Sequence, residues 1–528
     1  MSYTSYFYLL FFLGVLVALY YLMPLKKRWL VLLGGSYFFY WLASGKLIVF
    51  LLITTVSVYL GALAMEREQQ AFDSVRKSLE KEERKARKAV MMRRKRHIVF
   101  AMVLINVGLL AFLKYYHFFS ANINALGSHL EPGFQLPALK LLMPLGISFY
   151  TLSAVGYVID VYRGQTAADH HFGRLALFLS LFTNITEGPI SRYDQLAGQA
   201  FEGHRADYRQ FTFGAQLILW GLFQKMVLAD RAALLVSIVF GSPSDYSGGI
   251  VILAMFAYTL QIYADFAGCM DIVRGSGALF GIEIARNFNQ PFFSKSIGEF
   301  WRRWHMTLGA WFKDYIFYPV TLSKTNMKLG RWAKKHLSVH LGQAMTTAFA
   351  LFFVWLANGL WHGAAWKYVA YGMYYYVLTL FGLFGKPVIH CFYEKTGIRK
   401  ESRPWQLLLI IRTFILVNIG MLLFRANSLR IFAEMFESMF RKTTGNWLEL
   451  GLDRHDLAVL ALGALLMLMV GIVRERGICI RERIASWPMV LRWTVYAGVF
   501  CAIVLLGAYG SGYGVVDPLY AKIGRAHV

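Results

Sequence analysis

The sequence predicts an all-α, polytopic membrane protein, and three observations lead to this fold class. Of its 528 residues, 57% are hydrophobic and only 16% are charged, whereas a soluble domain carries about 25% charged residues. The hydrophobic residues gather in long runs without charges, and a membrane helix needs roughly 17 to 25 mainly apolar residues. The formal net charge of +25 lies mainly in segments between these runs. This composition excludes a disordered chain and argues against a soluble multidomain enzyme.

About eleven runs are long enough to cross a membrane. From the amino terminus onward they are expected at 1–23, 47–65, 97–119, 141–159, 210–228, 246–264, 343–366, 368–385, 404–424, 457–473 and 493–516. Two shorter apolar runs, 29–43 and 175–186, are expected to be short or re-entrant segments. Such segments are tolerated at membrane depth only where protein surrounds them.

The first run is expected to be a membrane span and not a cleaved signal peptide. It lacks the basic amino-terminal region and the small-residue cleavage site of a signal peptide, and the cluster of Lys26, Lys27 and Arg28 comes after it. Because positive residues stay on the cytoplasmic side, the amino terminus is expected outside the cell and this cluster in the cytoplasm.

The hydrophilic segment 66–97 is expected to form a charged cytoplasmic helical arm. Helix-forming residues dominate it without Gly or Pro, and Glu80 and Arg84 have the favourable i,i+4 spacing. Its positive charge suits a position near anionic lipid headgroups, and its mixture of signs disfavours nucleic acid as a partner. Three further segments are rich in Lys and Arg and are also expected in the cytoplasm: 283–340, 386–403 and 474–483.

The four cysteines, Cys269, Cys391, Cys479 and Cys501, lie in or beside apolar runs. None of their spacings suits a metal ion or a redox pair, so we expect buried small hydrophobic residues without a disulfide. The sequence also has no phosphate-binding loop, no GxSxG nucleophile elbow and no HExxH zinc motif. No metal site and no permanently bound cofactor are therefore expected.

Segment 263–319 concentrates residues that could do chemistry. Five residues recur at helical spacing and predict a helical aromatic face: Trp301, Trp304, Leu308, Trp311 and Tyr315. Arg302 and Arg303 follow an acidic residue at pairing distance, and His305 and Asp314 lie in the same segment. Two interpretations stay open: an interfacial amphipathic helix with an aromatic belt, or a site in which ionisable groups lie among aromatic rings.

His362 lies in the motif WLANGLWHGAAW at 355–366, inside an apolar run without Asp, Glu, Lys or Arg. Ionisable groups inside a membrane are costly and are therefore functional candidates. The neighbouring Gly359 and Gly363 permit close backbone approach or a lined cavity. A low dielectric favours neutral imidazole, the form that a general base needs. The alternative is a structural histidine bonded to a neighbouring carbonyl.

A third patch, TEGPISRY at 186–193, contains a Gly-Pro helix break in an apolar region. Glu187 and Arg192 are in reach of each other for an ion pair. The alternative is a tight turn at a helix end.

The blocks YADFAG, NFNQPF and SIGEFWRRWHMTLGAWFKDYIFYP, followed by GLWHGAAW, resemble the membrane-bound O-acyltransferase family. Within that family the likeness is to the membrane subunits of bacterial alginate and exopolysaccharide O-acetyltransferases. TEGPISRY resembles the family's upstream GPIxRY segment. The resemblance implies a single transmembrane domain over 1–521, a bundle of about eleven helices with re-entrant and interfacial helices around a central tunnel.

The resemblance also implies residue roles. His362 matches the family's catalytic histidine, and His305 matches its second functional histidine. The residues expected to bind the acyl donor or substrate are Trp301, Arg302, Arg303, Trp304, Asp314, Asn358, Glu187 and Arg192. Apart from the resemblance, charge alone leads us to expect that five cations attract the phosphates of coenzyme A: Arg286, Lys295, Arg302, Arg303 and Lys313.

The expected function is transfer of an acetyl group from cytoplasmic acetyl-CoA across the bacterial plasma membrane, toward O-acetylation of a secreted or cell-surface polysaccharide. His362 would take the proton from the acceptor hydroxyl, and His305 would orient the acceptor or stabilise developing charge. The expected partner is an extracytoplasmic SGNH-hydrolase-like acetyltransferase that passes the acyl group to the polymer. The alternatives are D-alanyl transfer to teichoic acid and, in another class, a non-catalytic transporter or export scaffold.

The last seven residues, KIGRAHV at 522–528, stand where the relatives that the chain resembles end with an aromatic-rich tail. The codons AAG ATC GGA AGA GCA CAC GTC encode this heptapeptide and resemble a common sequencing-library adapter read in frame. We therefore expect 522–528 to be an assembly artefact in place of the native carboxy terminus.

Overall fold

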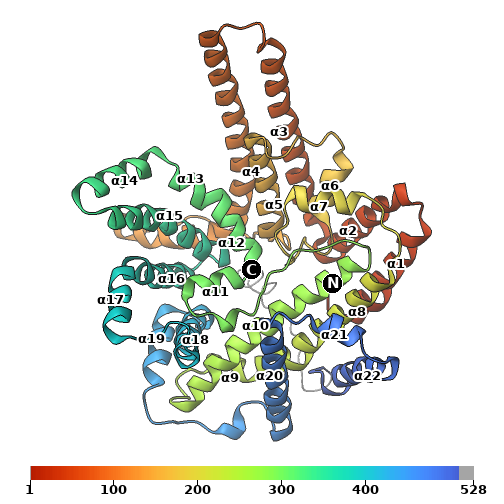
Figure 1. Ribbon diagram of the computed structural model, residues 1–528, viewed down its shortest axis with the longest axis vertical. Coiled ribbons are helices and arrows are strands. Elements are labelled where there is room, and N and C mark those ends of the chain that lie inside the picture. The colour runs from red at the N-terminus through yellow and green to blue at the C-terminus, as the bar shows by residue number, and fades with distance from the viewer. Residues whose placement is uncertain (1, 132, 510–528) are drawn as a thin grey trace. The chain divides into compact units, whose positions relative to one another are not determined.

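The computed structural model describes residues 2–131 and 133–509, and every regular element in these ranges is a helix (Figure 1). This confirms the all-α fold class. The described residues pack as two compact units: the first comprises 2–131, 133–215 and 273–285, and the second comprises 216–272 and 286–509. The single domain expected over 1–521 stays a prediction, and the expected artefact at 522–528 lies outside the described residues.

The helices of the first unit follow its alternation of apolar runs with glycine, proline and charged breaks. They are η1 (Phe7–Phe12), α1 (Leu13–Leu22), η2 (Leu25–Lys27), α2 (Arg28–Ser44), η3 (Gly45–Leu47), α3 (Ile48–Val75), α4 (Lys81–Leu130), α5 (Ile147–Arg163), α6 (Phe172–Ser180), α7 (Tyr193–Phe201) and the start of α8 (Tyr208–Leu222).

The charged segment 66–97 forms the far end of a long hairpin made by α3 and α4 (Figure 1). Within the charged segment, Arg94 donates to Glu68 at 3.3 Å and Lys95 Nζ donates to Gln69 at 3.3 Å, and both contacts join α4 to α3. Both are weak, exposed or part-buried contacts, so the packing of the apolar part of α3 on α4 must contribute most of the hairpin's stability.

A buried turn follows α6 in the first unit. The Tyr3 hydroxyl donates to the carbonyl of Phe182 at 2.7 Å and accepts from Thr186 at 2.6 Å. A Cβ at Gly188 would stand 2.2 Å from the carbonyl oxygen of Thr183, so only glycine fits this turn. The short segment expected at 175–186 is thus a short helix and a turn. Its polar backbone groups form hydrogen bonds to protein groups, as the membrane interior requires.

The second unit contains the larger number of helices. They are the end of α8, η4 (Phe223–Ala229), α9 (Asp230–Gly241), most of α10 (Gly249–Ala278), η5 (Pro291–Phe293), α11 (Ile297–Arg303), α12 (Met306–Phe312), η6 (Lys313–Phe317), α13 (Tyr318–Thr321), α14 (Lys324–His336), α15 (Val339–His362), α16 (Trp366–Phe384), α17 (Lys386–Thr396), α18 (Arg403–Arg425), α19 (Leu429–Ser438), η7 (Trp447–Glu449), α20 (Arg454–Glu475), α21 (Ile480–Ala485) and α22 (Met489–Leu506).

Buried ion pairs tie several helices of the second unit together. Lys225 Nζ lies 2.5 Å from Asp230 and 2.7 Å from Asp265, so one ammonium joins η4, α9 and α10. Arg231 contacts Asp456 at 2.8 Å and so joins α9 to α20. Because removal of one partner would leave a buried charge unpaired, these pairs fix which helices are neighbours.

Seven helices among the described residues are long and apolar enough to cross a membrane, or eight if one bent pair counts as a span. The seven are Leu25–Val75, Lys81–Leu130, Gly249–Ala278, Val339–His362, Arg403–Arg425, Arg454–Glu475 and Met489–Leu506, and the bent pair is Trp366–Phe384 with Lys386–Thr396. The chain is therefore a multi-pass membrane protein.

The count is lower than the eleven expected, for three physical reasons. The run at 1–23 yields only the shorter helix Phe7–Leu22. The run at 141–159 starts its helix late, because Gly146 adopts a left-handed turn with φ 73°. The run at 210–228 is divided, because α8 ends at Leu222 and the π-helix η4 follows. The run at 29–43, expected as a short or re-entrant segment, instead forms α2 within the single helical stretch Leu25–Val75.

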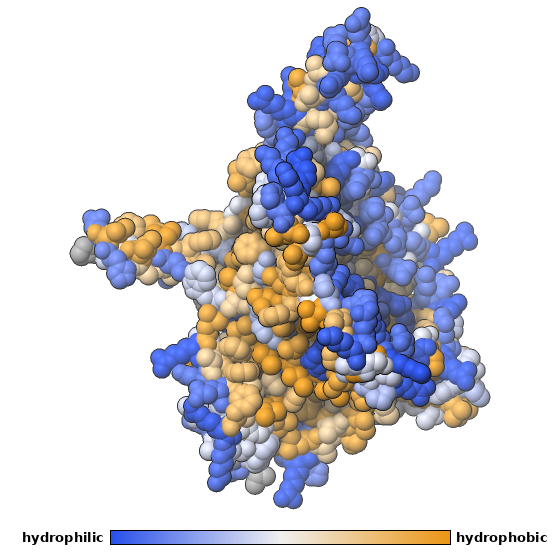
Figure 2. All heavy atoms as spheres, turned by 60° about the vertical axis from the view of Figure 1, so that its left-hand side comes forward, coloured by the Kyte–Doolittle hydropathy of each residue, from blue (hydrophilic) through white to orange (hydrophobic). Residues whose placement is uncertain are grey.

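Apolar side chains also cover the outside of the candidate spans, as a lipid environment requires. Figure 2 shows a broad hydrophobic surface, and exposed apolar residues of the second unit include Phe352, Phe381 and Leu407. The cysteines follow this pattern: Cys269 is buried, but Cys391, Cys479 and Cys501 are exposed. The expectation of four buried cysteines was therefore wrong for three, because apolar runs in this chain supply outer faces as well as a core.

Helices α15 and α16 pack closely because glycines face the partner backbone. A Cβ at Gly359 would stand 2.4 Å from the carbonyl oxygen of Tyr368, and a Cβ at Gly372 would stand 2.3 Å from that of Trp355. Backbone cannot move aside as a flexible side chain does. These glycines therefore fix the position of the carboxyl end of α15.

Gly372→Ala will lower the stability of the protein by about 1–3 kcal/mol, because the added methyl group overpacks the contact between α15 and α16. Gly382→Ala, on the same helix, is the matched control, since nothing lies within 4 Å of its Cβ. It should be neutral or stabilising by up to about 1 kcal/mol. Thermal unfolding of the detergent-solubilised variants measures both effects, and equal midpoints would contradict the packing argument.

Candidate active site

The segment with the predicted aromatic face is two helices and a break between them. Ser296 caps α11 by accepting from the backbone N–H of Glu299 at 3.1 Å, and α11 ends at Arg303. His305 has φ 46°, a left-handed conformation that is uncommon outside glycine, and α12 begins after it. The helical aromatic face expected from Trp301 to Tyr315 was therefore wrong across His305.

Asn287 holds this break in place. Its Oδ1 accepts from the backbone N–H of Thr307 at 3.1 Å and from the Thr307 hydroxyl at 2.7 Å, and it lies 3.4 Å from Nδ1 of His305. Its carbonyl oxygen accepts from the N–H of Met306 at 3.0 Å. One buried asparagine thus stabilises both the unusual backbone of His305 and the position of its ring. Asn287 was not singled out from the sequence, although it begins the NFNQPF block.

His305 is only 2% exposed, and burial lowers its pKa to about 3. The ring is therefore neutral at physiological pH. It packs edge-on against Phe266 at a ring-centre distance of 4.8 Å, and against Trp361 at 5.5 Å. A neutral imidazole can donate one hydrogen bond and accept another without titrating during turnover.

Acidification below about pH 6.5 will destabilise the protein through His305. The unfolded chain takes up a proton near pH 6.5, whereas the folded protein does not until about pH 3, so stability falls across that window. The stability of a His305→Asn variant should depend less on pH between 6.5 and 4.5 than that of the unchanged protein. Thermal midpoints at several pH values measure the difference, and parallel curves would contradict a neutral buried His305.

His362 is the last residue of α15 and is 4% exposed. Its ring meets Trp361 at 5.0 Å, Phe424 at 5.0 Å and Tyr371 at 5.6 Å, all edge-on. Trp361 therefore touches both His305 and His362. Two histidines that lie 57 positions apart in the sequence share one aromatic neighbour in the second unit.

Asn358 lies one helical turn before His362, so both side chains leave the same face of α15. It is 6% exposed, and its Oδ1 has no hydrogen-bond partner among the described residues. The indole nitrogens of Trp301 and Trp355 are buried without a partner in the same part of the chain. Since buried polar groups are nearly always bonded, these atoms are candidates for contacts to a substrate.

The remaining donor-binding candidates of the second unit take different positions. Trp301 packs against Trp355 at 5.1 Å, beside α15, but Trp304 is a core residue stacked on Phe300. Arg303 makes a two-pronged ion pair with Glu475 at 2.7 and 3.0 Å, which indicates a structural role. Arg302 is exposed and Asp314 is half-buried in η6.

Glu187 and Arg192 belong to the first unit. Arg192 lies 3.9 Å from Asp160, and the turn that carries Glu187 is held by Asn184, whose amide donates to the Pro189 carbonyl at 2.9 Å. This supports the tight-turn interpretation of TEGPISRY. Their role in donor binding stays a prediction.

Among the described residues, no three His, Cys, Asp or Glu side chains come together in a way that could hold a metal ion. The chemistry available at Trp361 is that of two histidines, an amide and buried indole N–H groups. Such a set can accept a proton, donate hydrogen bonds to a developing oxyanion and exclude water.

Comparisons with known proteins point to one chemistry. Residues 167–424 match the model of the membrane-bound O-acyltransferase family. A probable alginate O-acetylase of Pseudomonas aeruginosa is 32% identical over 366 residues, which are 69% of this chain and 64% of that protein. A peptidoglycan O-acetyltransferase of Helicobacter pylori is 28% identical, covering 64% of this chain and 63% of that protein. A teichoic acid D-alanyltransferase of Bacillus subtilis is 30% identical, covering 56% of this chain and 72% of that protein. The chain thus spans less than two thirds of the alginate relative's length.

Proposed function

Because the chain belongs to the membrane-bound O-acyltransferase family, we propose that it transfers an acyl group from a thioester donor to a hydroxyl acceptor, with His362 as the general base. The observation that carries this proposal is the pairing of His362 and Asn358 on one face of α15, with Trp361 in contact with both histidines. A transporter without chemistry would leave this arrangement unexplained.

The proposed step uses the residues at the end of α15. His362 removes the proton from the acceptor hydroxyl as its oxygen attacks the thioester carbonyl. The carbonyl oxygen gains negative charge, which the amide N–H groups of Asn358 would stabilise. The thiolate then leaves and takes up a proton from the imidazolium of His362. His305, neutral and fixed by Asn287, would orient the acceptor oxygen.

The donor is proposed to be acetyl-CoA, used as a substrate from the cytoplasm. Arg286, Arg302 and Lys313 are exposed in the second unit, and cations of this kind suit the phosphates of coenzyme A. The acceptor pathway is proposed to lead to a secreted or cell-surface polysaccharide through an extracytoplasmic SGNH-hydrolase-like partner. The chain would lie in the bacterial plasma membrane with its amino terminus outside.

A second candidate function is D-alanyl transfer to teichoic acid. It is favoured by the 30% identity to the Bacillus subtilis D-alanyltransferase over 72% of that protein. The two functions differ in the donor, which is acetyl-CoA in the first and a D-alanyl thioester on a carrier protein in the second.

The purified protein in lipid nanodiscs, supplied with radiolabelled acetyl-CoA or D-alanyl carrier protein, distinguishes these functions. We expect release of free coenzyme A and transfer of label to a hydroxyl acceptor. Consumption of the carrier thioester alone would select the alternative. Consumption of neither donor, by protein that is monodisperse and thermally stable, would contradict acyl transfer.

A further inference from the structure

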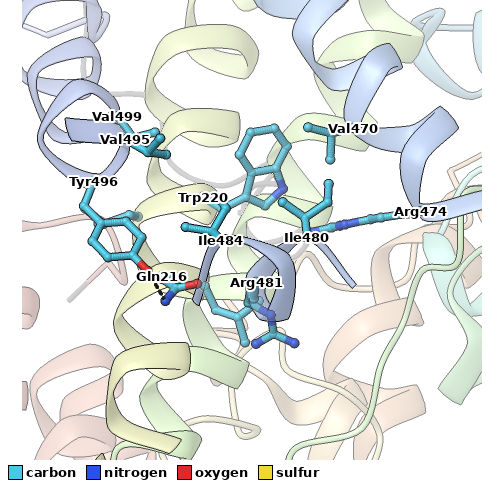
Figure 3. Close-up of a pocket in the computed structure, with 12 residues that line it drawn as sticks. Gln216, Trp220, Val470, Arg474, Ile480, Arg481, Ile484, Val495, Tyr496 and Val499 are labelled. Atoms are coloured by element: carbon cyan, nitrogen blue, oxygen red, sulfur yellow. Dashed lines mark hydrogen bonds between the residues drawn. The ribbon is translucent and has the colours of Figure 1, made fainter. Parts of the chain in front are cut away.

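A pocket in the second unit lies away from the two histidines, between the end of α8 and helices α20, α21 and α22 (Figure 3). Its empty volume is about 590 Å³, including the space at its open mouth. Because much of this space is open to the outside, the pocket is a groove that can hold part of an amphiphile while the rest of the molecule stays outside. No residue of the proposed catalytic machinery lines it.

The pocket is apolar along its walls and basic at one end. Figure 3 shows the Trp220 indole at its centre, with Val470 and Val495 beside it. Two arginines, Arg474 and Arg481, also line it, and the Arg474 guanidinium lies 5.9 Å from the Trp220 ring centre. An apolar wall with a cationic end is complementary to a molecule that has a hydrocarbon chain and an anionic head.

The position of the lining residues places this pocket at a membrane boundary. Val470 lies within the candidate span α20, and Val495 lies within the candidate span α22. These two spans are the most exposed of the seven, with 11% and 6% of their apolar windows buried. Arg474 lies in the last turn of α20, where the hydrophobic run ends. A lipid would thus meet the walls at acyl-chain depth and the arginines at headgroup depth.

The charge around the mouth also favours an anion. Glu475, the acidic residue next to Arg474, is paired with Arg303 at 2.7 and 3.0 Å. The segment 474–483 contains four arginines and two glutamates, so its basic residues outnumber its acidic ones. The ion pair with Arg303 neutralises one of these glutamates and increases the excess of positive charge. An anionic headgroup near the surface gains about 1 kcal/mol per neighbouring Lys or Arg, which corresponds to roughly fivefold in affinity.

We propose that this pocket binds one anionic glycerophospholipid. The phosphate contacts Arg474 and Arg481, and one acyl chain lies along Trp220, Val470 and Val495. The lipid would hold α20, α21 and α22 against α8, where Gln216 already donates to the Tyr496 hydroxyl at 3.0 Å. This site is separate from acyl transfer and does not depend on the proposed function.

Native mass spectrometry of the full-length protein tests this proposal, with phosphatidylglycerol, phosphatidylcholine or inorganic phosphate added to delipidated samples. We expect one tightly bound phosphatidylglycerol, at least about tenfold weaker binding of phosphatidylcholine, and no effect of inorganic phosphate. The double variant R474Q/R481Q should lose the preference for phosphatidylglycerol. The matched control is R476Q/R483Q, whose arginines belong to the same segment but do not line the pocket.

A second pair of variants separates loss of the site from loss of the fold. R474K/R481K keeps the charge and should keep the preference for phosphatidylglycerol. V470W fills the apolar part and should weaken binding of phosphatidylglycerol even with both arginines present. Equal binding of the two lipids by the unchanged protein would overturn the proposal. Unchanged lipid preference in folded R474Q/R481Q, or its loss in R476Q/R483Q alone, would overturn it as well.

Discussion

His362→Gln will lower the rate of acyl transfer by about 10²–10⁴-fold, because a positioned general base contributes a factor of this size. Glutamine fills a similar volume and offers hydrogen bonds, but it cannot take a proton from the acceptor hydroxyl. The loss should appear in kcat more than in KM, since the base acts in the transition state. The measurement is turnover of labelled acetyl-CoA by purified protein in nanodiscs.

His336→Gln is the matched control for this change. His336 is an exposed histidine in the last turn of α14, and its ring contacts the carbonyl oxygen of Trp332. Its replacement should leave the rate within about twofold, because an exposed side chain that contacts none of the candidate site residues contributes little. A well-folded His362→Gln protein that turns over at the unchanged rate would remove His362 from the proposed chemistry.

His362 could be predicted as a candidate from the sequence because its signal is local. A histidine inside a long uncharged run is costly in a membrane, and the helix that carries it needs no information from elsewhere in the chain. The structure adds what the run does not contain: the contact of Trp361 with His305, and Gly372 of α16, which brings that helix against α15. The all-α fold class is predictable for the same reason. In a membrane, the backbone N–H and C=O groups of a hydrophobic run must form their hydrogen bonds within the run, which a helix allows.

The conformation at His305 could not be predicted from local sequence patterns. The spacing of Trp301, Leu308 and Tyr315 predicts a helical face, yet the chain breaks at His305 because Asn287 bonds the backbone and hydroxyl of Thr307. That contact joins residues 20 positions apart, and no periodicity within the segment carries it. The number of candidate spans is lower than expected for a related reason. A hydropathy run does not reveal where its helix begins or ends, as at Gly146 before α5 and at Leu222 after α8.

Asn287→Ala will lower kcat by about 10²-fold while leaving KM for the donor nearly unchanged. Asn287 is a positioning residue in this proposal: it touches no substrate, but it fixes the backbone and ring of His305. Its removal leaves the Thr307 N–H and hydroxyl without their acceptor and allows the left-handed turn to relax. Displacement of a reacting or orienting group by about 1 Å can cost roughly 10²-fold in rate.

The control and the conservative change separate positioning from folding. Asn289→Ala, two residues along, removes an exposed side chain and should have little effect on rate or stability. Asn287→Asp keeps an acceptor for Thr307, so it should restore part of the rate that Asn287→Ala loses. If Asn287 served packing alone, both substitutions would lower the thermal midpoint, and neither would lower kcat more than it changes KM.

Because His305 is buried and neutral, a carboxylate beside it should also raise the pKa of His305. The acidic limb of the pH–rate profile of the Asn287→Asp enzyme should therefore lie at higher pH than that of the unchanged enzyme. An unchanged pH–rate profile of Asn287→Asp, together with full activity of Asn287→Ala, would show that the turn at His305 keeps its conformation without Asn287.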